Sequence, residues 1–152
     1  MITEQQKALV RSTFSAVEPI ADKAAEIFYA KLFEYDPQLK ALFRHDMKEQ
    51  GRMLMSALKL AVATLDDLDS LVPVLQRMAI KHVEYGVKMD DYTPVGNALL
   101  FALKTGLGVA YTDAVRDAWT ETYRVVATVM REAAYDSYDP VTYKNSRRYH
   151  RS

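Results

Sequence analysis

The chain has three histidines, the residue type that most commonly binds a metal, and only one of them lies in an apolar pattern. His45 stands in a polar corner and His150 in a basic C-terminal stretch, so we interpret both as solvated surface groups. His82 follows Met78 by four residues and Leu75 by seven, so it continues the apolar face of a predicted helix. Such a histidine is either a core residue bonded to a backbone carbonyl or a metal ligand directed into a cavity. Spacing alone favours the core residue.

Composition limits the metal centre that His82 could serve. The chain has no cysteine, which excludes disulfides, iron–sulfur clusters, zinc–thiolate sites and thioether-linked cofactors. No second histidine lies near His82, so a zinc or copper ion held by protein alone would lack ligands. A metal that brings its own equatorial donors would not lack ligands. Haem, here haem b, is such a metal centre.

Two polar residues on other predicted helices could face a ligand of such a metal. Tyr29 follows Phe28 on a mostly apolar helix, and Gln50 precedes Leu54 by four residues, which places these two on one face. Taken singly, Tyr29 is more simply a core tyrosine and Gln50 a solvated first-turn residue. Taken together, they would be hydrogen-bond donors to a diatomic ligand.

The helices that must position these residues are marked by start and stop signals. The signals are a capping-box spacing at Thr3 and Gln6, the cap-then-proline pairs Asp36-Pro37 and Thr93-Pro94, Pro73 in a first turn, Gly86 as a stop and Thr112 as a final cap. We expect helices over about residues 4–18, 20–34, 37–43, 47–65, 71–85, 94–105 and 113–134.

The length and composition predict one all-α domain. The chain has 152 residues, of which 49% are hydrophobic, and only five glycines and five prolines, with no Asn-Gly or Asp-Gly hairpin signal. About seven helices of unequal length without a repeat indicate an irregular helical fold. Residues 1–134 form the predicted domain, and residues 135–152, poor in aliphatic side chains, form a predicted mobile tail.

The charge pattern excludes several partners. Twenty basic and twenty acidic residues cancel, which argues against nucleic-acid binding and against a strongly charged membrane-surface protein. The N-terminal residues carry no apolar signal region, and no apolar run is long enough to span a membrane. With no cysteine, these features fit a reducing interior, and we expect a cytoplasmic protein.

Five segments in order resemble one known family. They are FYAKLF (28–33), ALF (41–43) after an Asp-Pro, KHVEYGV (81–87), YTPVG (92–96) and AWTETY (118–123). The chain resembles the globins over about residues 3–133, and more narrowly the bacterial single-domain haemoglobins of the flavohaemoglobin lineage. The stretch GVKMDDYTPVGNALLFAL is also similar to neuroglobin. The resemblance implies a globin fold of about seven to eight helices around a haem pocket.

The resemblance also implies a role for individual residues. It makes His82 the axial iron ligand, Phe43 the ring against the porphyrin, Tyr29 and Gln50 the distal hydrogen-bond donors, and Leu54 the apolar distal wall. It has the proximal and inner edges lined by Val87, Tyr92, Val95 and Leu99. Tyr85, Arg44 or His45 could reach a haem propionate, although a purely structural role is as reasonable for each.

The sequence departs from its apparent relatives at two positions. Neuroglobins carry a histidine that occupies the sixth iron position where this chain has Gln50, so we expect an open distal side in the ferrous state. His45 could take that position only if its corner refolded. Flavohaemoglobins polarise the proximal histidine through a tyrosine and a late glutamate, but Ala134 stands at the matching position and Glu132 is off register.

The implied function is reversible binding of oxygen and other diatomics, such as NO and CO, for oxygen storage or delivery. One alternative is a nitric oxide dioxygenase, which would need an external reductase because the chain has no Gly-rich phosphate loop for a flavin or nicotinamide cofactor. A second alternative is a haem-based sensor or an interaction module. We expect a monomer or a weak homodimer.

Overall fold

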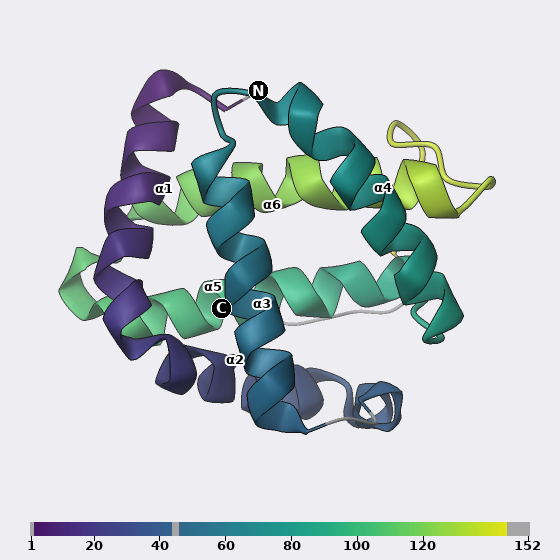
Figure 1. Cartoon of the computed structure of the whole chain (residues 1–152), viewed down its shortest axis with the longest axis horizontal. Coiled ribbons are helices and arrows are strands. Elements are labelled where there is room, and N and C mark those ends of the chain that lie inside the picture. The colour runs from purple at the N-terminus through teal and green to yellow at the C-terminus, as the bar shows by residue number, and fades with distance from the viewer. Residues whose placement is uncertain (1, 44–45, 146–152) are drawn as a thin grey trace.

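The computed structural model describes residues 2–43 and 46–145, which form helices and turns without a strand (Figure 1). Within these ranges the α-helices are α1 (Glu4–Val17), α2 (Ala21–Tyr35), α3 (Met47–Ala63), α4 (Leu68–Glu84), α5 (Tyr92–Leu107) and α6 (Asp113–Ala134). Short 3-10 helices are η1 (Glu18–Ile20), η2 (Pro37–Leu42), η3 (Met89–Asp91) and η4 (Gly108–Ala110). The all-α prediction is confirmed, and the short helix expected at 37–43 is η2. No helix in the described ranges is long and apolar enough to cross a membrane.

Several helix ends lie where side-chain caps predict them. Thr3 and Gln6 form a reciprocal capping box at the start of α1. The Asp36 carboxylate caps η2, and the Thr112 hydroxyl accepts the N–H of Val115 at 3.2 Å at the start of α6. Each of these oxygens satisfies a backbone donor that the first helical turn leaves unpaired.

Two helix starts differ from the prediction. α4 begins at Leu68, so Pro73 lies in its second turn, on an exposed face where water can bond the carbonyl that the proline leaves unpaired. α5 begins at Tyr92, and Thr93 is therefore inside the helix rather than its cap. The 3-10 turn η3 leads directly into α5, and Asp91 accepts a hydrogen bond from the Lys88 N–H at 2.8 Å.

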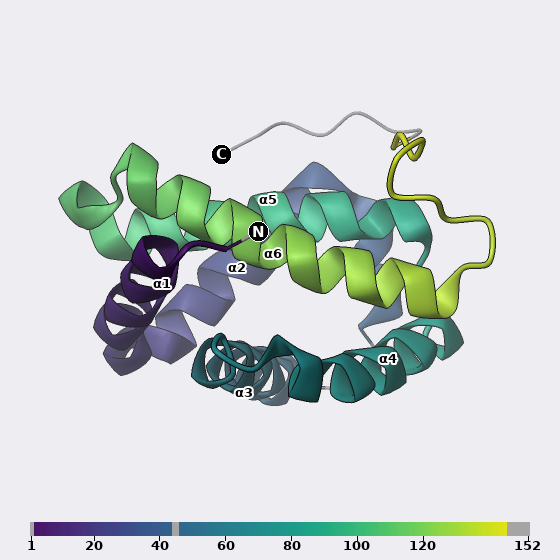
Figure 2. The ribbon, with the colours of Figure 1, turned by 90° about the horizontal axis from the view of Figure 1, so that it is seen from above.

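The helices form two layers. α5 and α6 run antiparallel and side by side, whereas α3 and α4 both lie along one side of that pair (Figures 1 and 2). α2 packs mainly on α5, and α3 packs on α2. Both α1 and α4 pack on α6. α3 and α4 are therefore supported by different helices.

Two glycines permit close helix crossings. A Cβ on Gly51 of α3 would lie 3.0 Å from the Cβ of Ala25 on α2. A Cβ on Gly96 of α5 would lie 2.6 Å from the ring of Tyr123 on α6. Both distances are below ordinary van der Waals contact, so a methyl group at either position would require the neighbouring helix or ring to shift.

Buried side chains form two clusters. The larger cluster joins α1, α2, α5 and α6 and includes Val10, Phe14, Leu32, Leu103 and Trp119. The smaller cluster joins α4 to α6 through Leu71, Leu75, Ala79, Ala127 and Met130. The indole Nε1–H of Trp119 donates to the Thr13 hydroxyl at 2.9 Å, so the polar atom of the largest core side chain is paired.

Candidate functional site

His82 lies in the last turn of α4 with a partly buried ring. Its Nδ1 atom is 2.6 Å from the carbonyl oxygen of Met78, one turn earlier. A carbonyl can only accept a hydrogen bond, so this contact assigns the proton to Nδ1 and leaves a lone pair on Nε2. Burial lowers the pKa of His82, and the bond to the Met78 carbonyl opposes that shift. This neutral tautomer is the form in which histidine binds metals.

Tyr29 and Gln50 meet where α2 crosses the first turn of α3. The Tyr29 hydroxyl donates to the backbone carbonyl of Gln50 at 3.2 Å, which is long for an O–H···O bond. Burial raises the pKa of Tyr29 to about 12, so the hydroxyl keeps its proton at neutral pH and remains a donor. The close crossing at Gly51 brings these two residues together.

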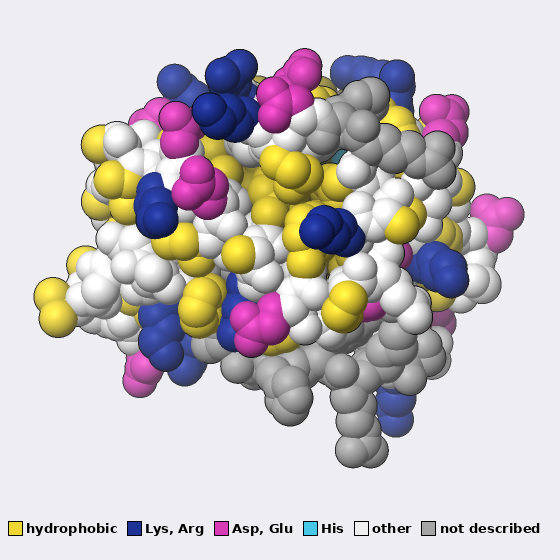
Figure 3. All heavy atoms as spheres, turned by 90° about the horizontal axis from the view of Figure 1, so that it is seen from below, with side chains coloured by type: hydrophobic (Ala, Val, Ile, Leu, Met, Phe, Trp, Pro, Cys, Tyr) yellow, Lys and Arg dark blue, Asp and Glu magenta, His cyan; other side chains and the backbone are white. Residues whose placement is uncertain are grey.

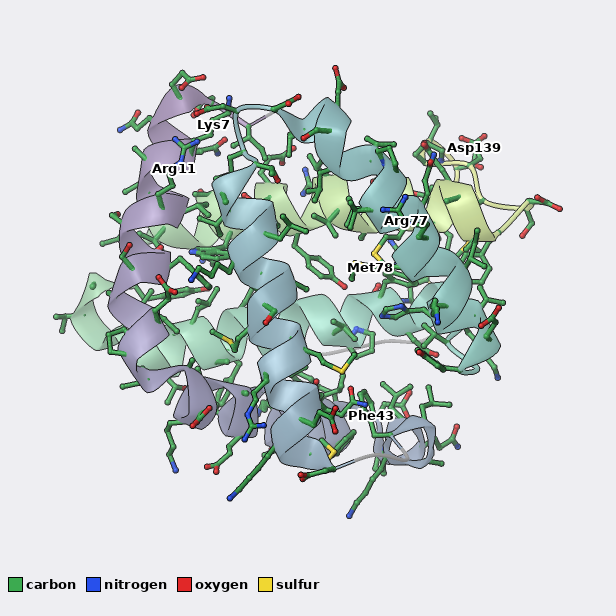
Figure 4. The ribbon with its side chains drawn as sticks, viewed as in Figure 1. Lys7, Arg11, Phe43, Arg77, Met78 and Asp139 are labelled. Atoms are coloured by element: carbon green, nitrogen blue, oxygen red, sulfur yellow. The ribbon has the colours of Figure 1, made fainter. Side chains whose placement is uncertain are left out.

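Aromatic rings surround Tyr29. Its ring centroid lies 4.9 Å from that of Phe28 and 5.3 Å from that of Phe43, both edge-on. Phe33 also packs on Phe43 at 5.4 Å. In Figure 4 Phe43 lies near the first turn of α3, and Met78 projects from α4 toward α3. Apolar side chains also reach the surface in the middle of the face shown in Figure 3, between scattered charged groups.

Leu54 and Leu99 border a small apolar cavity beside this aromatic group. The cavity measures about 20 Å³, and its lining comes from α1, α2, α3 and α5, including Phe28, Leu54, Leu58, Leu99 and Ala102. That volume holds about one water-sized molecule, and an apolar lining disfavours water.

The remaining predicted site residues lie around the end of α4 and the start of α5. Tyr85 is exposed, with its ring 6.3 Å from that of His82. The Val87 N–H donates to the His82 carbonyl at 3.0 Å. Tyr92 is 5% exposed, and its hydroxyl has no partner among the described residues. Val95 is half-buried on α5. Arg44 and His45 lie outside the described residues.

The available ligands match haem rather than a metal held by protein alone. Among the described residues, no group of three or more His, Cys, Asp or Glu side chains could hold a metal ion. In the part of the chain that the structure describes, His82 is the histidine that offers an unprotonated nitrogen, beside the apolar residues Met78 and Val87. One imidazole in apolar surroundings fits a metal centre that carries its own equatorial donors.

The sequence interpretation missed the residues that contact the loop after α4. Arg131 and Tyr135 donate side-chain hydrogen bonds to the carbonyls of Met89 and Val87. Arg131 follows Tyr123 by eight residues, so helical periodicity places it on the inward side of α6 and could have identified it. The predicted domain boundary coincides with the end of α6 at Ala134. The mobility of the tail stays a prediction.

Comparisons with known proteins identify the family. The Globin family model matches residues 26–130. Flavohemoprotein from Chromobacterium violaceum is 34% identical over 134 residues, which cover 86% of this chain and 33% of that protein. Neuroglobin from Chaenocephalus aceratus is 30% identical over 145 residues, covering 86% of this chain and 91% of the other. The chain belongs to the globin family, as the sequence resemblance implies, and this membership supports haem binding.

Solved structures agree with this assignment. An engineered carbene transferase from Rhodothermus marinus superimposes with a TM-score of 0.78 at 28% identity, covering 88% of this chain and 94% of the other. A bacterial globin from Campylobacter jejuni gives a TM-score of 0.77 at 24% identity, covering 88% of this chain and 97% of the other, and supports the fold alone. The chain spans about one third of the length of the flavohemoproteins that it matches.

Proposed function

We propose that this globin holds haem b through Nε2 of His82 and binds oxygen and other diatomics, such as NO and CO, reversibly. The observation that carries the proposal is the 2.6 Å contact between His82 Nδ1 and the Met78 carbonyl in a chain whose residues 26–130 match the Globin family. This contact orients the ring and leaves Nε2 as the ligand atom. Haem b is the form proposed because the chain has no cysteine for a thioether link.

Haem, when bound, would supply an iron atom that can take a diatomic ligand. The Tyr29 hydroxyl would be the first donor to that ligand, which carries partial negative charge, and such a bond contributes about 1.5–3 kcal/mol. Its present bond to the Gln50 carbonyl is long, at 3.2 Å, so little stability is lost when the hydroxyl turns toward a ligand. The Gln50 amide is the second donor, and Leu54 keeps water away.

The other site residues serve the cofactor by packing. Phe43 is held edge-on against Tyr29 and Phe33, so its ring is ready to press on a flat macrocycle. The proximal and inner edges of the haem pocket would be lined by Val87, Tyr92, Val95 and Leu99. Tyr85, which is exposed beside His82, would bond a propionate.

Optical spectroscopy of the unaltered protein and two variants tests the assignment of His82. We expect the purified protein to show a Soret band, which His82→Gly weakens and added imidazole restores, because free imidazole can replace the missing ring. His45→Ala serves as the control and should leave the oxidised and reduced spectra unchanged. Full absorption in His82→Gly without imidazole would contradict the proposal.

A second candidate function is nitric oxide dioxygenase activity. The carbene transferase from Rhodothermus marinus, at 28% identity, is described as a candidate nitric oxide dioxygenase. In this chain Tyr29 and Gln50 would hold oxygen in place for its reaction with NO to nitrate. The flavohemoproteins are about three times as long as their matched segment. A reductase is part of this proposal, because each turnover would leave the iron oxidised.

Kinetics separates a carrier from an enzyme. Stopped-flow mixing of the oxygenated protein with NO should give one rapid turnover to nitrate in both cases. Sustained NO consumption after addition of a flavin reductase and a nicotinamide cofactor would support the enzyme. Loss of activity after a single turnover under those conditions would favour the carrier.

A further inference from the structure

The loop between α4 and α5 is bonded from the C-terminal side of the chain. Three of its carbonyls accept hydrogen bonds from side chains 42 to 55 residues later: Val87 from the Tyr135 hydroxyl at 2.6 Å, Met89 from Arg131 Nε at 3.1 Å, and Asp90 from Asn145 Nδ2 at 3.0 Å. Backbone carbonyls in a short connecting loop are ordinarily left to water. Here the end of α6 and the following segment replace that water.

Arg131 is the centre of these contacts. Its guanidinium lies over the rings of Tyr143 at 4.6 Å, Tyr92 at 5.4 Å and Tyr138 at 5.9 Å. The Tyr143 hydroxyl also donates to the Asp90 carboxylate at 2.5 Å. One cation therefore joins α6, the start of α5 and the segment after α6, and it does so partly through cation–π contacts.

The same loop is continuous with His82. The Val87 N–H donates to the His82 carbonyl at 3.0 Å, while the Val87 carbonyl accepts from Tyr135 at 2.6 Å. Gly86 turns the chain between them with a φ of 98°, which favours glycine. Val87 therefore connects the backbone of His82 to the side chain of Tyr135 through two hydrogen bonds.

We propose that Arg131 and residues 135–145 form a clamp on this loop, and that Arg131, Tyr135 and Tyr143 are positioning residues for His82. The clamp holds the peptide of His82 so that its imidazole keeps one orientation, and it slows release of the cofactor. This inference rests on the proposed function, in which His82 is the haem ligand. For residues 135–145 it opposes the mobility that the sequence predicts.

Amide hydrogen exchange in the haem-loaded full chain tests the clamp directly. We expect Arg131→Gln and Tyr143→Phe each to speed exchange of the Val87 and Asp91 amides by about threefold to tenfold, because each variant removes hydrogen bonds to the loop. Arg131→Lys, which keeps the charge, should partly restore protection. Amides of α1 should keep their rates, because the effect is local rather than a general loss of stability.

The controls come from the same part of the chain. Arg124→Gln changes an exposed arginine of α6 that pairs with Glu121. Tyr138→Phe keeps the ring beneath Arg131 and removes a hydroxyl that has no hydrogen bond among the described residues. Neither should alter exchange of the loop. Hemin transfer to an excess of a haem-free acceptor should be faster in Arg131→Gln and Tyr143→Phe by a similar factor, and unchanged in the controls.

Two results overturn the proposal. Unchanged exchange at Val87 and Asp91 in both variants means that no clamp exists, and faster exchange with unchanged hemin loss means that the clamp does not act on the site. Failure of the proposed function is a separate result, seen as a Soret band that does not depend on His82. The exchange rates show whether the clamp exists, whether or not His82 binds the haem.

Discussion

At the residue scale, Tyr29 combines a buried ring with a hydroxyl that makes one long hydrogen bond. Tyr29→Phe keeps the ring packing and removes the donor, so we expect oxygen to dissociate about tenfold faster or more, since about 1.4 kcal/mol corresponds to a decade. Flash photolysis or stopped-flow displacement by CO measures the rate. Tyr111→Phe is the control, because it removes a buried hydroxyl without a partner among the described residues. Equal dissociation rates in wild type and Tyr29→Phe would remove Tyr29 from the proposed mechanism.

His82 predicts a pH dependence for the haem-free protein. Burial lowers its pKa below the ordinary 6.5, so the unfolded chain binds this proton more tightly than the folded chain does. The free energy of unfolding should therefore fall as the pH drops through about 6.5 toward the folded pKa, and this contribution is fully lost below it. Urea unfolding at several pH values measures the effect. His82→Gln should show a smaller decrease over that window, and parallel profiles would contradict the prediction.

The chemistry of His82 could be predicted only in part from the sequence. Its spacing from Met78 and Leu75 predicts an inward ring, and the ring is partly buried. The bond to the Met78 carbonyl fits both a core histidine and a metal ligand, so geometry at this residue does not distinguish the two interpretations. That distinction depends on what surrounds Nε2, which local periodicity does not encode.

At the element scale, the crossing of α2 and α3 depends on Gly51. A Cβ there would meet the Ala25 Cβ at 3.0 Å, so Gly51→Ala should reduce the free energy of unfolding by about 1–3 kcal/mol. Ala25→Gly in the same chain should cost less than it does alone, because it gives the new methyl room, although a glycine inside α2 itself costs about 1 kcal/mol. Gly106→Ala is the control, because its Cβ meets the flexible end of Ile20 at 3.3 Å. Additive effects of the two substitutions in a double-mutant cycle would show that the crossing is not the cause.

Helix boundaries could be predicted where a side chain makes the cap and not where packing sets the start. Thr3 and Thr112 cap their helices as the sequence indicates. α4 instead begins at Leu68, before the expected start, with no side-chain cap hydrogen bond at Asp67. Leu71 lies buried on this first part of α4, so burial of an apolar side chain outweighs the cost of placing Pro73 further inside the helix.

At the scale of the whole molecule, the sequence predicts the all-α architecture but not the contacts of residues 135–145. That segment looks separate because few of its residues are aliphatic. Its contacts with the chain use tyrosine hydroxyls, an amide and the rings around Arg131 instead. Such polar and aromatic contacts join residues more than 40 positions apart, and hydrophobic periodicity carries no signal for them.

The separate support of α3 and α4 leads to the last prediction. The distal residues Gln50 and Leu54 lie on α3, which packs on α2, whereas His82 lies on α4, which packs on α6. A cofactor bound between them would link the two helices, so hemin should raise the free energy of unfolding by about 4 kcal/mol at a thousandfold excess over its dissociation constant. Hydrogen exchange should slow most in α3 and α4. His82→Gly should lose most of this gain, and an equal gain in that variant would mean that hemin binds elsewhere.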